Sequence, residues 1–103
     1  MPPILRRLYH SFLVFALLMP VACAVSPPVQ EMSNARQTIQ AAIDAGAKQT
    51  APELLAKAQS SLGLASKELD VGEYDAARNH ANEAKQYAIK ARQMAMQKGQ
   101  KPE

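Results

Sequence analysis

Side chains that carry chemistry are scarce in this chain of 103 residues. It has one cysteine, no tryptophan and two histidines, of which only His80 lies beyond the first 25 residues. A lone cysteine forms no intramolecular disulfide, and a lone histidine completes neither a Ser–His–Asp set nor a zinc shell. The four glycines stand apart, so no glycine-rich phosphate loop exists. We therefore expect no catalytic activity, no metal and no cofactor.

Excess positive charge is also small once the N-terminus is set aside. Twelve Lys and Arg residues face nine Asp and Glu residues, but Arg6 and Arg7 are two of the twelve. The nearly neutral remainder is unlike that of a nucleic-acid-binding protein, so we expect no nucleic-acid partner. The charge is polarised, however: residues 31–75 have a net charge of −3 and residues 76–103 one of +4.

Residues 1–22 are predicted to be a signal peptide. Arg6 and Arg7 form a basic start, and Phe12–Met19 is an apolar run of eight residues. Such a run is far too short to span about 30 Å of hydrocarbon. Pro20 ends the run and small residues follow, which is the order of a secretory signal.

Cys23 is the predicted site of lipidation. The segment Met19–Cys23 resembles the lipobox of bacterial lipoproteins, with Pro20 where leucine is usual. Acyl chains such as palmitate would then anchor the chain in a membrane. Ala24 follows instead of aspartate, which in lipoproteins of the enteric type implies transport to the outer membrane. The alternative is that Ala22–Ala24 is an A-x-A site for ordinary signal peptidase, which would leave a soluble periplasmic protein.

The rest of the chain divides into a tether, a helical domain and a tail. Residues 23–30 are the expected tether, stiffened by Pro27 and Pro28. Residues 31–98 are the expected alanine-rich helical domain. Residues 99–103 are the expected disordered tail.

Apolar residues recur at spacings of three and four in three blocks of the helical domain. This periodicity is typical of helices packed through an a/d seam, as in a coiled coil. We expect helices at about 29–46, 51–70 and 73–98, and an all-α fold: a small antiparallel three-helix bundle. The expected seam residues are Met32, Ala35, Ile39, Ala42 and Gly46; Leu55, Ala58, Leu62, Ala65 and Leu69; and Tyr74, Ala77, Ala81, Ala84, Ala88, Ala91 and Ala95.

The helix ends are marked by glycine and by a capping pattern. Gly46 and Gly72 are expected to end the first and second helices. Thr50 and Glu53 are expected to form a capping box at the start of the second, with Pro52 in the first turn.

Two sets of residues on the third helix are candidates for an interaction surface. Arg78, Lys85 and Arg92 recur every seven residues along one edge. They are either a solvated flank near acids such as Glu68 and Asp70, or a surface that attracts cell-wall polymer, lipid headgroups or an acidic partner. The second set lies off the alanine seam: Tyr87, Ile89, Met94 and Met96. Either Tyr87 and Met94 only widen the packed stripe toward the first helix, or the set forms a face for a partner or a second copy.

Three segments together resemble a known family. They are Ala51–Ala58 (APELLAKA), Val71–Arg78 (VGEYDAAR) and Ala81–Ala84 (ANEA), and they resemble the domain of unknown function 4398 family. The resemblance implies an alanine-rich helical protein of the bacterial envelope, often a lipoprotein, with no established activity. Tetratricopeptide repeats share the turn at Gly72, but no unit of about 34 residues recurs here.

The sequence therefore predicts a non-catalytic lipoprotein of the cell envelope. We expect it on the periplasmic side of the outer membrane, as a structural or protein-interaction module. Because alanine buries little apolar area, stability is expected to gain from a homo-oligomer or an envelope partner. The alternative is a linker between outer membrane and cell wall, similar to murein lipoprotein, although Lys101 is not terminal as such a covalent attachment would need.

Overall fold

The computed structural model describes residues 3–17 and 26–99, and in these ranges every regular element is a helix. The helices are α1 (Pro3–Leu17), α2 (Val29–Asp44), α3 (Ala47–Thr50), α4 (Pro52–Asp70) and α5 (Tyr74–Gly99). The predicted all-α class is confirmed for this part of the chain. The three predicted helices correspond to α2, α4 and α5, while the short α3 lies between the first two of them and was not predicted.

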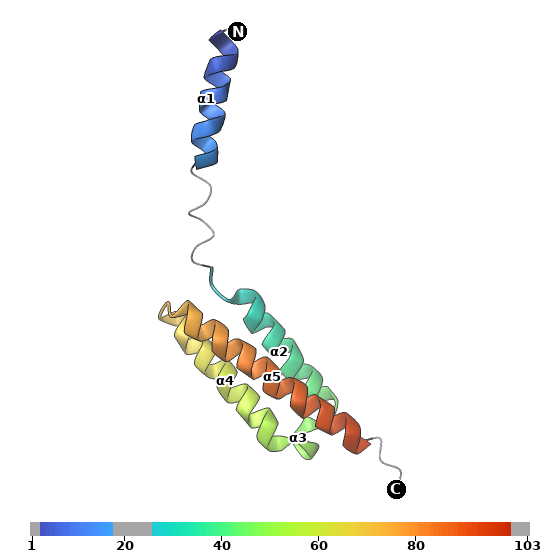
Figure 1. Ribbon diagram of the computed structural model, residues 1–103. Coiled ribbons are helices and arrows are strands. Elements are labelled where there is room, and N and C mark those ends of the chain that lie inside the picture. The colour runs from blue at the N-terminus through green and yellow to red at the C-terminus, as the bar shows by residue number, and fades with distance from the viewer. Residues whose placement is uncertain (1–2, 18–25, 100–103) are drawn as a thin grey trace.

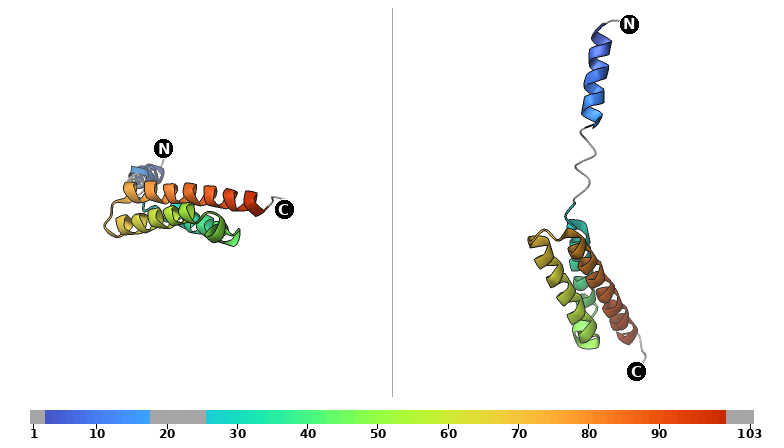
Figure 2. Two further views of the ribbon diagram at one scale, coloured as in Figure 1. Left: turned by 90° about the horizontal axis from the view of Figure 1, so that it is seen from below. Right: turned by 60° about the vertical axis from the view of Figure 1, so that its left-hand side comes forward.

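The helices α2, α4 and α5 lie side by side in all the views of Figures 1 and 2. The chain runs down α2, turns through α3, returns along α4 and runs down α5, so α4 is antiparallel to both neighbours. Packing is most extensive between α4 and α5, next between α2 and α5, and much sparser between α2 and α4. The long helix α5 is therefore the element on which the other two rest.

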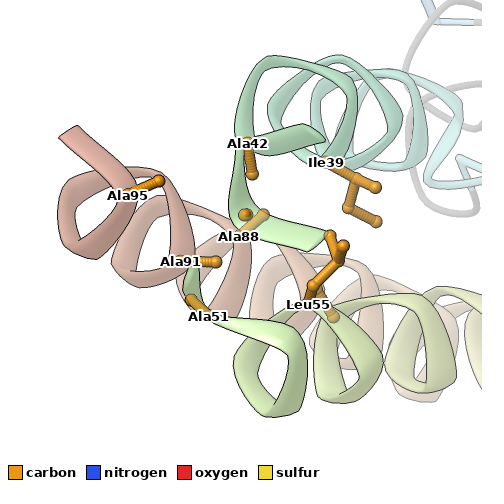
Figure 3. Packing of buried hydrophobic residues seen from close by; sticks show 9 residues of the cluster. Ile39, Ala42, Ala51, Leu55, Ala88, Ala91 and Ala95 are labelled. Atoms are coloured by element: carbon orange, nitrogen blue, oxygen red, sulfur yellow. The ribbon is translucent and has the colours of Figure 1, made fainter. Parts of the chain in front are cut away.

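Alanine dominates the core. Of the fifteen buried apolar residues in the described ranges, twelve are alanine and only Met32, Ile39 and Leu55 are large. Figure 3 shows Ile39 and Leu55 beside the small Ala88 and Ala91 of α5. Such small side chains let helix backbones approach closely, and the few large ones fill the space between them. The predicted stripe of α5 is confirmed at its six alanines: Ala77, Ala81, Ala84, Ala88, Ala91 and Ala95.

The predicted seam of α4 is wrong at two positions. Ser61 is buried, whereas Leu62 and Leu69 are only half-buried. Both leucines pack against the small cluster that contains Met32 of α2. The backbone of α4 thus approaches α5 through small residues, and its leucines lie on the flank toward α2. A heptad pattern treats all seam positions alike and does not separate these two directions.

The turns follow the glycine predictions. Gly72 has a φ of 80°, and its N–H donates to the carbonyl of Leu69 while that of Glu73 donates to the carbonyl of Glu68. This pair of bonds is the Schellman pattern that ends a helix. Gly46, with a φ of 97°, follows the end of α2 in the same left-handed conformation.

The predicted capping box at Thr50 is wrong. Thr50 is the last residue of α3, and its hydroxyl donates to the carbonyl of Gly46. Ala51 occupies the cap of α4 without a side-chain hydrogen bond, while Pro52 opens the helix as predicted. The extra turn α3 takes the threonine away from the cap, because Gly46 allows the chain to start a new helical turn at once.

Helices reach both ends of the described ranges, with α1 of 15 residues at the N-terminal end and α5 ending at Gly99. Side chains of α1 from Pro3 to Leu13 are exposed, and no described helix is long and apolar enough to cross a membrane. Cys23 lies outside the described residues. At the other end Gly99 is the last residue of α5 and not part of the tail, while 100–103 lie outside the described range.

Candidate interaction surfaces

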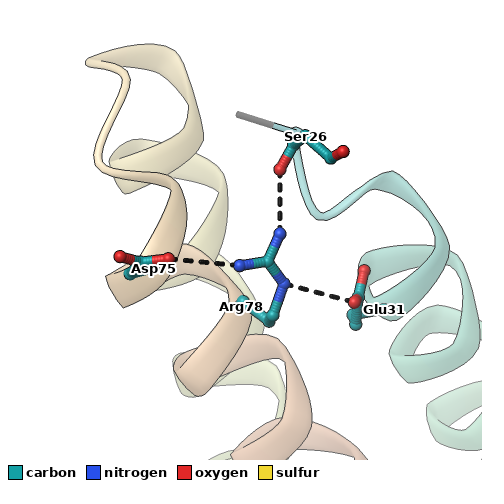
Figure 4. A network of polar contacts seen from close by, with 4 residues as sticks. All are labelled: Ser26, Glu31, Asp75 and Arg78. Atoms are coloured by element: carbon teal, nitrogen blue, oxygen red, sulfur yellow. Dashed lines mark hydrogen bonds and ion pairs between the residues drawn. The ribbon is translucent and has the colours of Figure 1, made fainter. Parts of the chain in front are cut away.

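Arg78 of α5 joins three segments of the chain. Its Nη2 donates to the backbone carbonyl of Ser26 at 2.8 Å, its Nε to Oε1 of Glu31 at 3.3 Å, and its Nη1 to Oδ1 of Asp75 at 3.2 Å (Figure 4). The side chains of Arg78 and Glu31 are each about one-third exposed. A planar guanidinium has five donors in a fixed fork, which suits it to hold partners in three directions.

This network attaches the start of the folded unit to α5. Ser26 is 52 residues from Arg78 in sequence, and Pro28, two residues further on, is fully buried. The helix α2 begins at Val29, inside the segment expected to be a tether. The packed structure therefore begins at Ser26, only three residues after Cys23.

The basic edge expected from Arg78, Lys85 and Arg92 is not uniform. Arg78 is engaged as described, Lys85 is half-buried and Arg92 is exposed. Within the described residues neither Lys85 nor Arg92 makes an ion pair. The expected neighbour Glu68 instead contacts His80, on the flank of α5 toward α4. Because helical residues seven apart share a flank, Lys85 and Arg92 lie with Arg78 on the flank toward α2.

The four apolar candidates do not form one face. Tyr87 and Met94 are seven residues apart and share one flank of α5, while Ile89 and Met96 share the other, about 200° around the helix. Tyr87 packs against the main core cluster, and Lys57 of α4 lies over its ring, with Nζ 5.8 Å from the centroid. Tyr87 thus widens the packed stripe toward α4, not toward α2 as expected.

A shallow cleft lies beside Met94 where α3 meets α4. It has a volume of about 290 Å³ and is lined by Thr50, Ala51, Pro52, Glu53, Leu54 and Met94. Lys98 of α5 contacts one of these lining residues, because its Nζ donates to the carbonyl of Thr50 at 2.6 Å. Sequence patterns missed this cleft because its wall depends on the unexpected turn α3.

One known protein family matches most of the chain. The family described as Domain of unknown function (DUF4398) matches residues 30–103. The chain belongs to this DUF4398 family. The match starts one residue after α2 begins and includes all of α3, α4 and α5. Comparison with curated proteins and with solved structures found no match.

His80 of this DUF4398 chain is held by a structural contact. Its Nδ1 contacts Oε1 of Glu68, a carboxylate whose side chain is mostly buried. In the described ranges no three His, Cys, Asp or Glu residues are grouped to hold a metal ion. The pair therefore links α4 to α5 on the side opposite Arg78, so that polar contacts flank the alanine stripe on both edges.

Proposed function

We propose that the chain is a non-catalytic lipoprotein of the cell envelope. Acyl chains on Cys23 anchor it to the outer membrane, and residues 31–98 form a structural or protein-interaction module facing the periplasm. This module is a small three-helix bundle, in which α4 and α5 form an antiparallel hairpin with a turn like that of tetratricopeptide repeats, and α2 packs beside them.

The observation that carries the proposal is the place of Cys23 in the chain. It follows the apolar run Phe12–Met19 and precedes the packed structure at Ser26 by three residues. Fully extended, those three residues span at most about 11 Å. Acyl chains contribute about 0.8 kcal/mol per buried CH₂, so more than one chain holds a protein durably. A lipid at Cys23 would keep the folded unit next to the membrane.

The non-catalytic part of the proposal rests on the small number of histidine and cysteine side chains. The only histidine beyond the signal, His80, is engaged with Glu68 between two helices. Cys23 is either lipidated or removed in the two interpretations of the signal. Hydrolytic chemistry needs a nucleophile with an adjacent base, and the described residues offer no such pair beside His80.

Labelled palmitate tests the anchor. The chain expressed in a Gram-negative bacterium is expected to incorporate the label, whereas Cys23→Ala is expected to incorporate none. As a matched control, Ser26→Ala changes a nearby small residue and should label like wild type. Wild-type chain that remains unlabelled and is released with the periplasmic fraction contradicts the proposal and supports the soluble alternative. Recovery of the chain covalently bound to the cell wall would support the murein-lipoprotein-like linker instead.

A further inference from the structure

Charge is sorted between the two ends of the packed helices. The anchor end comprises residues 26–36 and 61–86, near Ser26 and the α4–α5 turn; the far end comprises residues 37–60 and 87–99, near α3 (Figure 1). The anchor end has six carboxylates and four cations. The far end has two carboxylates, Asp44 and Glu53, and five cations, all exposed: Lys48, Lys57, Lys90, Arg92 and Lys98.

Three of the far-end cations have no partner among the described residues. Lys57 lies over Tyr87 and Lys98 binds the carbonyl of Thr50, but Lys48, Lys90 and Arg92 make no hydrogen bond or ion pair there. At the anchor end Arg78 is engaged with the chain itself, and Arg36, Lys67 and Lys85 also make no such contact among the described residues. There, however, six carboxylates outnumber the four cations, so the net positive charge of the packed helices lies at the far end.

Apolar groups accompany these cations. Met94 and Met96 are 39% and 46% exposed. Met94 lies one turn beyond Lys90 on one flank of α5, while Met96 lies one turn beyond Arg92 on the other flank, about 200° around the helix. Met94 also lines the cleft of about 290 Å³ between α3 and α4. Methionine adapts its shape to irregular partners, which suits it to a docking surface.

We propose that the far end is a docking surface for an acidic segment of another protein. Lys90, one turn before Met94 on the same flank of α5, and Lys48 of α3 bind its carboxylates, and the cleft beside Met94 takes one of its apolar side chains. A polyanionic glycan has no group that fills such a cleft. Lipid headgroups of the anchoring membrane are less suitable, since α5 has 26 residues and separates the two ends by about 39 Å. Only the exclusion of lipid headgroups rests on the lipid anchor of the proposed function.

The test is a titration with two short labelled peptides, one of glutamate with interspersed leucine and one of glutamate with interspersed serine. The lipidated full chain is placed in nanodiscs of neutral phosphatidylcholine, with empty nanodiscs as blank, and binding is followed by fluorescence anisotropy. Wild type is expected to bind the leucine peptide several-fold more tightly than the serine peptide, and both more weakly at high salt. If Cys23 carries no lipid, the unlipidated chain is titrated in solution, so anchoring and docking are decided separately.

Matched double variants locate the surface. The far-end variant K48Q/K90Q is expected to bind the leucine peptide about fivefold more weakly. The anchor-end control R36Q/K67Q removes the same charge and should weaken binding less than about twofold. Met94→Ala should weaken binding of the leucine peptide and leave binding of the serine peptide unchanged. Equal losses in both double variants, or no binding by wild type at low salt, overturn the proposal. Equal affinity for the two peptides overturns the acidic-protein partner and favours a polyanionic polymer. Circular dichroism verifies that each variant is folded.

Discussion

Single alanines decide how closely the helices approach. Ala84 lies in the middle of α5 with no exposed surface, on the alanine stripe by which α5 packs against α2 and α4. Alanine contributes little apolar burial, so its value here lies in the space it leaves for a neighbouring backbone. The closely packed interior has no room for a larger side chain at this position unless a helix moves.

Overpacking at Ala84 should therefore be costly. Ala84→Leu is expected to lower the free energy of unfolding by about 1–3 kcal/mol. Gln86→Leu, at an exposed position of the same helix, should change it by less than about 0.5 kcal/mol. Helix propensity barely distinguishes alanine from leucine, so it does not produce the difference. Urea melts followed by circular dichroism measure both, and equal midpoints would show that α5 is not docked through its alanines.

Arg78 is the second residue with a large expected effect. Arg78→Gln removes two ion pairs and the bond to the carbonyl of Ser26. Because the guanidinium is one-third exposed, we expect a loss of only about 1–2 kcal/mol in the free energy of unfolding. Arg36→Gln changes the same charge at an exposed position and should cost less than about 0.5 kcal/mol. Hydrogen exchange at the start of α2 should also speed up in Arg78→Gln, and unchanged exchange there would refute the link to Ser26.

At the scale of elements, glycine acts in two opposite ways. Gly72 ends α4 with a φ of 80°, a conformation that L-residues with a side chain adopt only at a cost. Gly63 lies inside α4, exposed, and a Cβ added there would meet nothing within 4 Å. The same residue type is thus required at the turn and unfavourable in the helix.

Alanine substitution should separate the two glycines. Gly72→Ala is expected to destabilise the chain by about 1 kcal/mol. Gly63→Ala should stabilise it by about 0.5–1 kcal/mol, because glycine in a helix interior carries an entropic cost. Thermal melts of the two variants under identical conditions measure the difference. Shifts of the same sign would contradict the assigned turn and helix.

The periodicity of the sequence predicts these helices well, because apolar residues spaced by three and four indicate which face of a helix is buried. It places all six alanines of α5 correctly. It fails at Ser61, because the pattern does not tell which of two neighbouring helices a seam position faces. It also fails at Thr50, where local capping preference competes with the extra turn that Gly46 permits.

At the scale of the whole molecule, side-chain contacts between distant segments lay beyond sequence patterns. The spacing of Arg78, Lys85 and Arg92 indicates a common edge, and helix geometry agrees. The spacing does not predict that Arg78 contacts Ser26 and Glu31, which lie 52 and 47 residues away in the sequence. That contact converts one of three expected surface cations into a structural group.

The central claim is that a folded helical unit is attached to a membrane through Cys23, and the intact mass of the chain purified from bacterial membranes tests it most directly. The account predicts a chain that starts at Cys23 and carries the added mass of a diacylglyceryl group and an N-acyl chain. Cys23→Ala should yield no such species. An unmodified chain that starts at Val25 would contradict the account.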